Sequence, residues 1–233
     1  MKFFLTVLSI CSIILLSDGL PAPAMDMSAC HCFRDRSYDP AHRFAADDYL
    51  LATSYNSLMA RTFGISKGEI IMKKMRGGVN GNDLLISLFL GSACSRPYPL
   101  LLSIRADGGS WQQIARSACG GRDNGPILAA LQRDDRKAAL AGITDFMLEK
   151  RYPDTGEVIK KIQASLADNK KVALVLALAE QTGLSPDQIL RLYTAENRSF
   201  AQIAHEHGLG PEQVGKNLLK PSPRPQTPAH GGE

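Results

Sequence analysis

The sequence has 233 residues and carries 27 lysines and arginines against 23 aspartates and glutamates, a formal net charge of +4 that is spread along the chain. This mild excess without a basic cluster excludes the dense positive surface on which non-specific binding to nucleic acid or to anionic lipid depends. Hydrophobic residues make up 44% of the chain, enough for the core of one or two small globular domains.

Residues 1–24 have the three parts of a cleavable secretory signal peptide. Lys2 supplies the positive charge, and residues 3–16 form an almost unbroken apolar segment that is too short to span a bilayer. Small residues precede the expected cleavage site after Ala24. We therefore expect an exported protein, periplasmic or secreted, from a bacterial rather than a eukaryotic cell, with no membrane span once the signal is removed.

Removal of Cys11 with the signal peptide leaves Cys30, Cys32, Cys94 and Cys119. An even number of cysteines in an exported chain indicates disulfide bonds, and four cysteines allow three connectivities. We favour Cys94–Cys119, because both lie at the ends of neighbouring expected helices. Cys30 and Cys32 would then form a tight local pair or be bonded elsewhere.

Helices are expected from residue 45 onward. Residues 25–44 show no steady period and are expected to form an irregular, cysteine-containing arm. After them the apolar residues follow the i, i+3, i+4 spacing of helices, which predicts an all-α fold, a compact bundle of short helices. The first half, residues 45–120, is expected to hold helices at 45–63, 67–76, 84–93, 98–106 and 111–118, with Ser66, Asp83 and Ser110 as N-caps.

The second half, residues 126–219, repeats this order of helices and breaks. The expected helices are one long helix from Pro126 to about Arg151, a helix capped by Asp154 or Thr155, and helices at 171–181, 186–193, 200–207 and 211–219. Residues 220–233 are proline-rich and polar, and their composition predicts a disordered tail.

The two halves show weak internal similarity. Residues 51–119 laid over 139–208 give twelve identities, and Ser110–Ala115 pairs best with Ser199–Ala204. Because caps, breaks and an all-apolar helix fall in matching places, we predict two halves related by duplication, each with its all-apolar helix at the centre. The sequence leaves open whether the halves share one core.

Residues 199–218 contain a capped helix, a turn at Gly208 and a second helix. This pattern resembles the helix-turn-helix of bacterial DNA-binding regulators, including sigma-factor-like domains. The resemblance implies that Gln213, Lys216 and Asn217 of the second helix would face the major groove. The same residues also suit a purely structural role in a helical core. Export and the low basic density disfavour nucleic acid as the partner.

Cys30, His31 and Cys32, with His42 ten residues further on, form a candidate soft-metal cluster. The spacing differs from that of standard zinc sites, and thiols in exported proteins are more often oxidised. A metal ion at this arm is therefore an alternative interpretation, and we expect no other cofactor.

No familiar catalytic motif occurs in the sequence: it lacks C-x-x-C, C-x-x-C-H, G-x-S-x-G and a glycine-rich phosphate loop. The adjacent pairs Asp47-Asp48 and Asp134-Asp135 diverge by about 100° on a helix and are expected to be surface charges. Trp111 is expected to anchor the core.

By exclusion, these observations favour a non-catalytic binding or interaction module of the cell envelope, with a protein partner there. The alternatives that remain open are a metal-binding protein that uses the Cys30–His42 arm, a helix-turn-helix-like nucleic-acid binder, and an enzyme whose residues are scattered over several helices.

Overall fold

The computed structural model describes residues 33–120, 125–153 and 155–221. These residues form twelve α-helices and one short 3₁₀ helix, Pro40–His42, without any β-strand. The predicted all-α class is therefore confirmed. Within these ranges, no helix combines the length and the apolar character needed to cross a membrane.

We divide the helices along the chain into two sets of six, which places residues 125–132 in the first set instead of in the expected second half. The first set comprises α1 (Asp47–Phe63), α2 (Lys67–Met75), α3 (Gly81–Cys94), α4 (Tyr98–Ala106), α5 (Trp111–Cys119) and α6 (Gly125–Gln132). The second set comprises α7 (Arg136–Arg151), α8 (Gly156–Ser165), α9 (Asn169–Thr182), α10 (Pro186–Thr194), α11 (Phe200–Glu206) and α12 (Pro211–Leu218).

The expected long helix from Pro126 to Arg151 is wrong, because the chain breaks between α6 and α7. Asp134 has a left-handed backbone with φ of 60°. The side chain of Asp135 then accepts a hydrogen bond from the backbone N–H of Ala138 and caps α7. Aspartate stabilises this geometry because its short side chain bonds to the nearby backbone.

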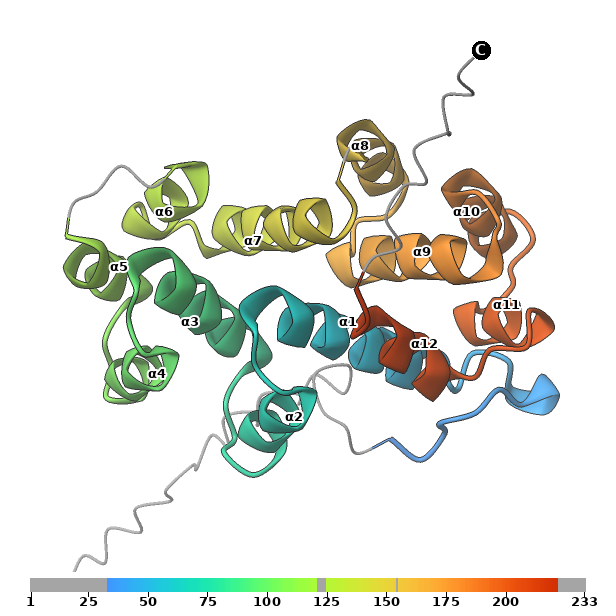
Figure 1. Cartoon of the computed structure of the whole chain (residues 1–233), viewed down its shortest axis with the longest axis horizontal. Coiled ribbons are helices and arrows are strands. Elements are labelled where there is room, and N and C mark those ends of the chain that lie inside the picture. The colour runs from blue at the N-terminus through green and yellow to red at the C-terminus, as the bar shows by residue number, and fades with distance from the viewer. Residues whose placement is uncertain (1–32, 121–124, 154, 222–233) are drawn as a thin grey trace, which may run out of the picture.

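The most buried helix is α1, and not α3 or α9, the two apolar-rich helices that were expected at the centres of the two halves. Fourteen of the 17 residues of α1 are buried, against eight of 14 in α3 and seven of 14 in α9. Figure 1 shows α3 to α6 gathered at one end and α8 to α11 at the other. The helix α1 packs mainly on α12 and α9 of the second set, whereas α7 packs on α6 and α3 of the first.

One continuous core joins the two sets. Trp111 in the first set and Phe200 in the second are both fully buried, and the apolar cluster runs through nearly all of the helices. Trp111 is thus a core anchor, as expected. Cys94 and Cys119 form the favoured disulfide, with their Cα atoms 5.0 Å apart, and tie the end of α3 to the end of α5.

The close approach of α12 to α1 depends on Gly215. A Cβ atom at Gly215 would lie 2.8 Å from Thr53 Oγ1 and 2.9 Å from Lys67 Nζ, which is closer than such atoms pack. Lys67 in turn donates a hydrogen bond to Thr53 Oγ1. The helix α1 can therefore carry small polar residues and still be covered by another helix.

Asp83 does not cap α3, because Asn80 accepts the hydrogen bond from the backbone of Asn82 instead. Asp83 Oδ1 accepts hydrogen bonds of 2.7 Å from Trp111 Nε1 and from Arg136 Nη2. Asp83 therefore joins α3 to α5 and to the start of α7.

Asp47 is not a surface charge, in contrast to the expectation from the adjacent pair Asp47-Asp48. Its carboxylate is buried and accepts hydrogen bonds from the backbone N–H groups of Phe200 and Ala201, at 3.2 and 2.8 Å. These N–H groups open α11 and have no partner inside that helix. The first residue of α1 thus completes the N-terminus of a helix more than 150 residues away.

We predict that Asp47→Ala lowers the free energy of unfolding by about 1–3 kcal/mol at neutral pH, because two buried N–H groups lose their acceptor. Asp48→Ala is the matched control, since Asp48 is exposed on the same turn. Urea unfolding of the two variants measures the difference. Equal stability of the Asp47→Ala and Asp48→Ala proteins would contradict the role of Asp47.

The burial of the Asp47 carboxylate adds a pH dependence to the stability of the protein. Burial raises the pKa of Asp47 to about 6. The folded protein then binds this proton more tightly than the unfolded chain. Proton binding therefore adds a further stabilisation that is complete below about pH 4 and is lost as the pH rises through about 6. The cost of Asp47→Ala should therefore increase by up to about 3 kcal/mol between about pH 7 and pH 4.

Candidate functional site

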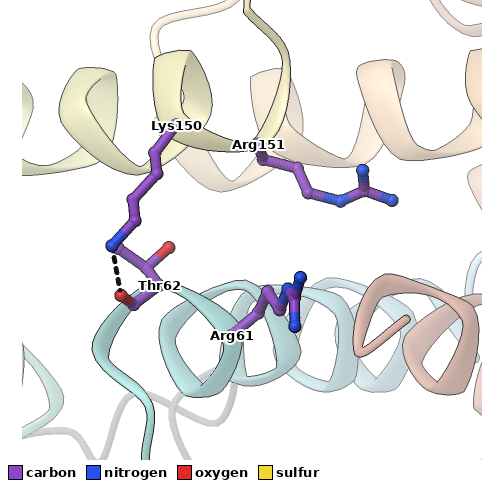
Figure 2. A pocket seen from close by; sticks show the side chains of 4 residues that line it. All are labelled: Arg61, Thr62, Lys150 and Arg151. Carbon is purple, nitrogen blue, oxygen red and sulfur yellow. Dashed lines mark hydrogen bonds between the residues drawn. The ribbon is translucent and has the colours of Figure 1, made fainter. Parts of the chain in front are cut away.

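A cavity of about 180 Å³ lies where the last turns of α1 and α7 face each other. Its lining consists of Arg61 and Thr62 from α1 and Lys150 and Arg151 from α7. Figure 2 shows the side chains of Lys150 and Arg151 below α7 and those of Arg61 and Thr62 on α1 beneath them. Three of the four lining side chains are cationic.

Local sequence explains why cations gather at these helix ends. The last turn of a helix carries unpaired carbonyl groups and a partial negative charge, which basic side chains stabilise. Gly64 ends α1 with φ of 69°, and Arg61 is the basic residue of its last turn. Lys150 donates a hydrogen bond of 2.9 Å to the carbonyl oxygen of Thr62, so one helix end caps the other.

Arg151 is the buried member of the group. Its side chain is 4% exposed, and its Nη2 donates a hydrogen bond of 2.6 Å to Glu180 Oε1 of α9. Within the described chain, its Nε and Nη1 atoms have no hydrogen-bond partner. A buried guanidinium group normally has its donors satisfied, because an unpaired buried donor costs about 1–3 kcal/mol or more.

Tyr152 lies beside Arg151 but is not part of the cavity lining. The guanidinium carbon of Arg151 lies 5.1 Å from the centre of the Tyr152 ring, within the range of a cation–π contact. Burial and the negative charge of Glu180 raise the pKa of Tyr152 far above its ordinary value. The phenol therefore stays neutral and adds no negative charge to the site.

The charges of the site do not balance. Glu180 pairs with Arg151, but no carboxylate among the described residues lies within ion-pair distance of Arg61 or Lys150. The three cations thus face one shared space with a single carboxylate beside them. Such an arrangement can accept the oxygens of an anion, since arginine and lysine are the usual ligands of carboxylate and phosphate groups.

The candidate metal residues are only partly described. Cys30, His31 and Cys32 lie outside the described residues, as does the expected cleavage site at Ala24. His42 is exposed, and a hydrogen bond of 3.0 Å between its Nδ1 and Asp39 Oδ2 raises its pKa. The described part of the chain contains no group of three or more His, Cys, Asp or Glu residues that could hold a metal ion.

The candidate nucleic-acid residues lie together on α12. Gln213 and Lys216 are exposed, and Asn217 is half-buried. Lys216 pairs with Glu212 at 2.8 Å, and Gln213 donates to Asn217, which itself donates to Gln181 of α9. The polar groups of this helix are therefore largely bonded within the protein, and its opposite face packs on α1.

Sequence reasoning missed the cavity residues. Arg61 and Arg151 each look like an ordinary basic residue in a last helical turn, 90 positions apart in the chain. One signal was present: the alignment of the two halves places Arg61 and Thr62 against Glu149 and Lys150, so the two helix ends correspond.

Comparison with known proteins gives no match to a family model, a curated protein or a solved structure. The chemistry of the cavity itself is therefore the indication of function in this chain.

We predict strong coupling between Arg151 and Glu180. Arg151→Met leaves Glu180 without its cation, and Glu180→Leu removes the remaining partner of a buried guanidinium, so each should destabilise the protein by about 3 kcal/mol. The double variant Arg151→Met/Glu180→Leu removes both charges and should cost much less than the sum. Urea unfolding of all four proteins gives the coupling energy, and additive costs would contradict a buried ion pair.

Proposed function

We propose that this protein is an exported, non-catalytic binding module that holds the anionic group of a ligand in the cavity between α1 and α7. The observation that carries this proposal is the gathering of three cationic side chains around one cavity, with no carboxylate of the described chain paired to Arg61 or Lys150. An anion would accept hydrogen bonds from the exposed side chains of Arg61 and Lys150 and would balance their charges.

The size of the cavity supports a small anionic group. Its volume of about 180 Å³ corresponds to several water molecules at about 30 Å³ each, which leaves room for a carboxylate or a phosphate group. Arg61 and Lys150 are exposed and can approach such a group from the solvent side, while the buried Arg151 adds positive charge from the protein side.

The signal-like segment at residues 1–24 supports action outside the cytoplasm, in the periplasm or as a secreted protein. The disulfide between Cys94 and Cys119 agrees with an oxidising compartment. In this setting the protein would serve the cell envelope as a module that binds a ligand and works with a protein partner there.

The proposal includes descent by duplication. The two sets of six helices follow the same order, with lengths of 17, 9, 14, 9, 9 and 8 residues against 16, 10, 14, 9, 7 and 8. Ser110 and Ser199 cap the corresponding helices α5 and α11 in the same way. An experimental structure in which the two sets fail to superpose would contradict this descent.

Inorganic phosphate and acetate are the probes for the anion site. We expect saturable binding of one anion per chain, with a dissociation constant of roughly 1 mM, measured by calorimetry or by NMR titration. Arg61→Gln and Lys150→Gln should each weaken binding by about tenfold, because each removes a charged hydrogen-bond donor.

Lys137→Gln is the matched control, since Lys137 is an exposed cation on the same helix α7 but away from the cavity. This variant should bind both probes as the unchanged protein does. Absence of saturable binding, or equal weakening in all three variants, would overturn the anion site.

Export predicts a mature chain that begins at Met25. The protein recovered from an exporting host should have the mass of residues 25–233, and chemical reduction should add two hydrogens per disulfide. Intact mass spectrometry with and without reductant makes the measurement. An uncleaved chain retained in the cytoplasm would contradict the assignment to the envelope.

A further inference from the structure

An apolar groove of about 360 Å³ lies next to the cationic cavity. Phe89, Ser92 and Ala93 of α3 line it together with Ile127 of α6 and Phe146 of α7. Phe146 is 37% exposed, and among the described phenylalanines only Phe44, at 44%, is more exposed. An exposed apolar surface of this kind is typical of a binding groove.

Two contacts connect the groove to the cavity. Phe146 and Lys150 are four residues apart on α7, so they share one helix face about 6 Å apart along the axis. The Lys150 ammonium nitrogen lies 5.9 Å from the centre of the Phe146 ring. Phe63, which follows Thr62 of the cavity, has its ring centre 6.5 Å from that of Phe146.

The aromatic side chains of the groove support one another. The rings of Phe89 and Phe146 meet edge to face with their centres 5.8 Å apart, and Phe63 completes the row. Phe89 is buried, so it fixes the position of the more exposed Phe146. The groove therefore has a formed aromatic wall before any ligand enters.

We propose that the ligand is an amphiphilic anion of the fatty-acid type. Its carboxylate would lie among Arg61, Lys150 and Arg151, and its apolar chain would follow Phe146 into the groove. The surface is complementary to such a molecule, because it has cations at one end and aromatic rings at the other. This inference rests on the proposed anion site and adds the class of ligand.

A series of linear carboxylates tests the proposal on the unchanged protein. Acetate, butanoate, hexanoate and octanoate are titrated as monomers, with octanol as the uncharged probe. Full burial of one methylene strengthens binding about fourfold, and a groove open to water on one side buries part of each. Octanoate should therefore bind at least about tenfold more tightly than butanoate, and octanol should bind much more weakly than octanoate.

Variants distinguish the contribution of the ligand's carboxylate to binding from the contribution of its alkyl chain. Phe146→Ala should reduce the gain from butanoate to octanoate to about threefold or less while leaving acetate binding unchanged. Ile104→Ala is the matched control, because Ile104 is 39% exposed on α4 and lies outside the groove. Arg61→Gln should weaken every carboxylate by the same factor, whatever its chain length.

The possible outcomes distinguish failure of the amphiphilic ligand from failure of the anion site on which it rests. Equal affinity for all carboxylates would overturn the amphiphilic ligand and leave the anion site standing. Octanol that binds as well as octanoate would show that the head group is not held by the cations, and would overturn the amphiphile. Failure of every anion to bind would overturn the anion site as well. The chain-length series needs no variant, so a misfolded Phe146→Ala protein does not prevent the test.

Discussion

The structure depends on the burial of α1 against helices from the other half of the chain. A helix with 14 of 17 residues buried has to satisfy its polar side chains within the protein. Tyr55 bonds to Thr144 of α7 at 2.8 Å, Lys67 donates to Thr53, and Gly215 lets α12 come close enough to cover them. Hydrogen bonds to Asp47 at the start of α1 and to Thr62 at its end then join α1 to α11 and to α7.

Helix positions could be predicted because their signals are local. Ser66 and Ser110 cap helices through backbone groups three residues away, and Ser110 forms a capping box with Gln113. Such contacts form whatever the rest of the chain does. Asp47 and Asp83 were misjudged because their partners lie far along the sequence, where neither spacing nor periodicity carries information.

The candidate site could not be predicted for the same reason. Basic residues near a helix C-terminus are common and stabilise the helix end, so Arg61 and Arg151 gave no separate signal. They form a candidate site only because α1 and α7 bring their ends together around one cavity and because Arg151 is buried away from water. Three like charges in one small cavity cost free energy that the fold alone does not need, since an apolar residue could fill the position of a buried arginine.

The location of the cavity would couple ligand binding to the packing of the whole chain. Arg61 belongs to the first set of helices and Arg151 to the second, so neither set holds a complete site. A ligand bound between them binds only the assembled form and therefore stabilises the packing of α1 on α7 by mass action. Because α1 also packs against α9 and α12, this stabilisation would extend to the core of the second set. A ligand in this cavity would thus stabilise the same long-range helix packing that defines the fold.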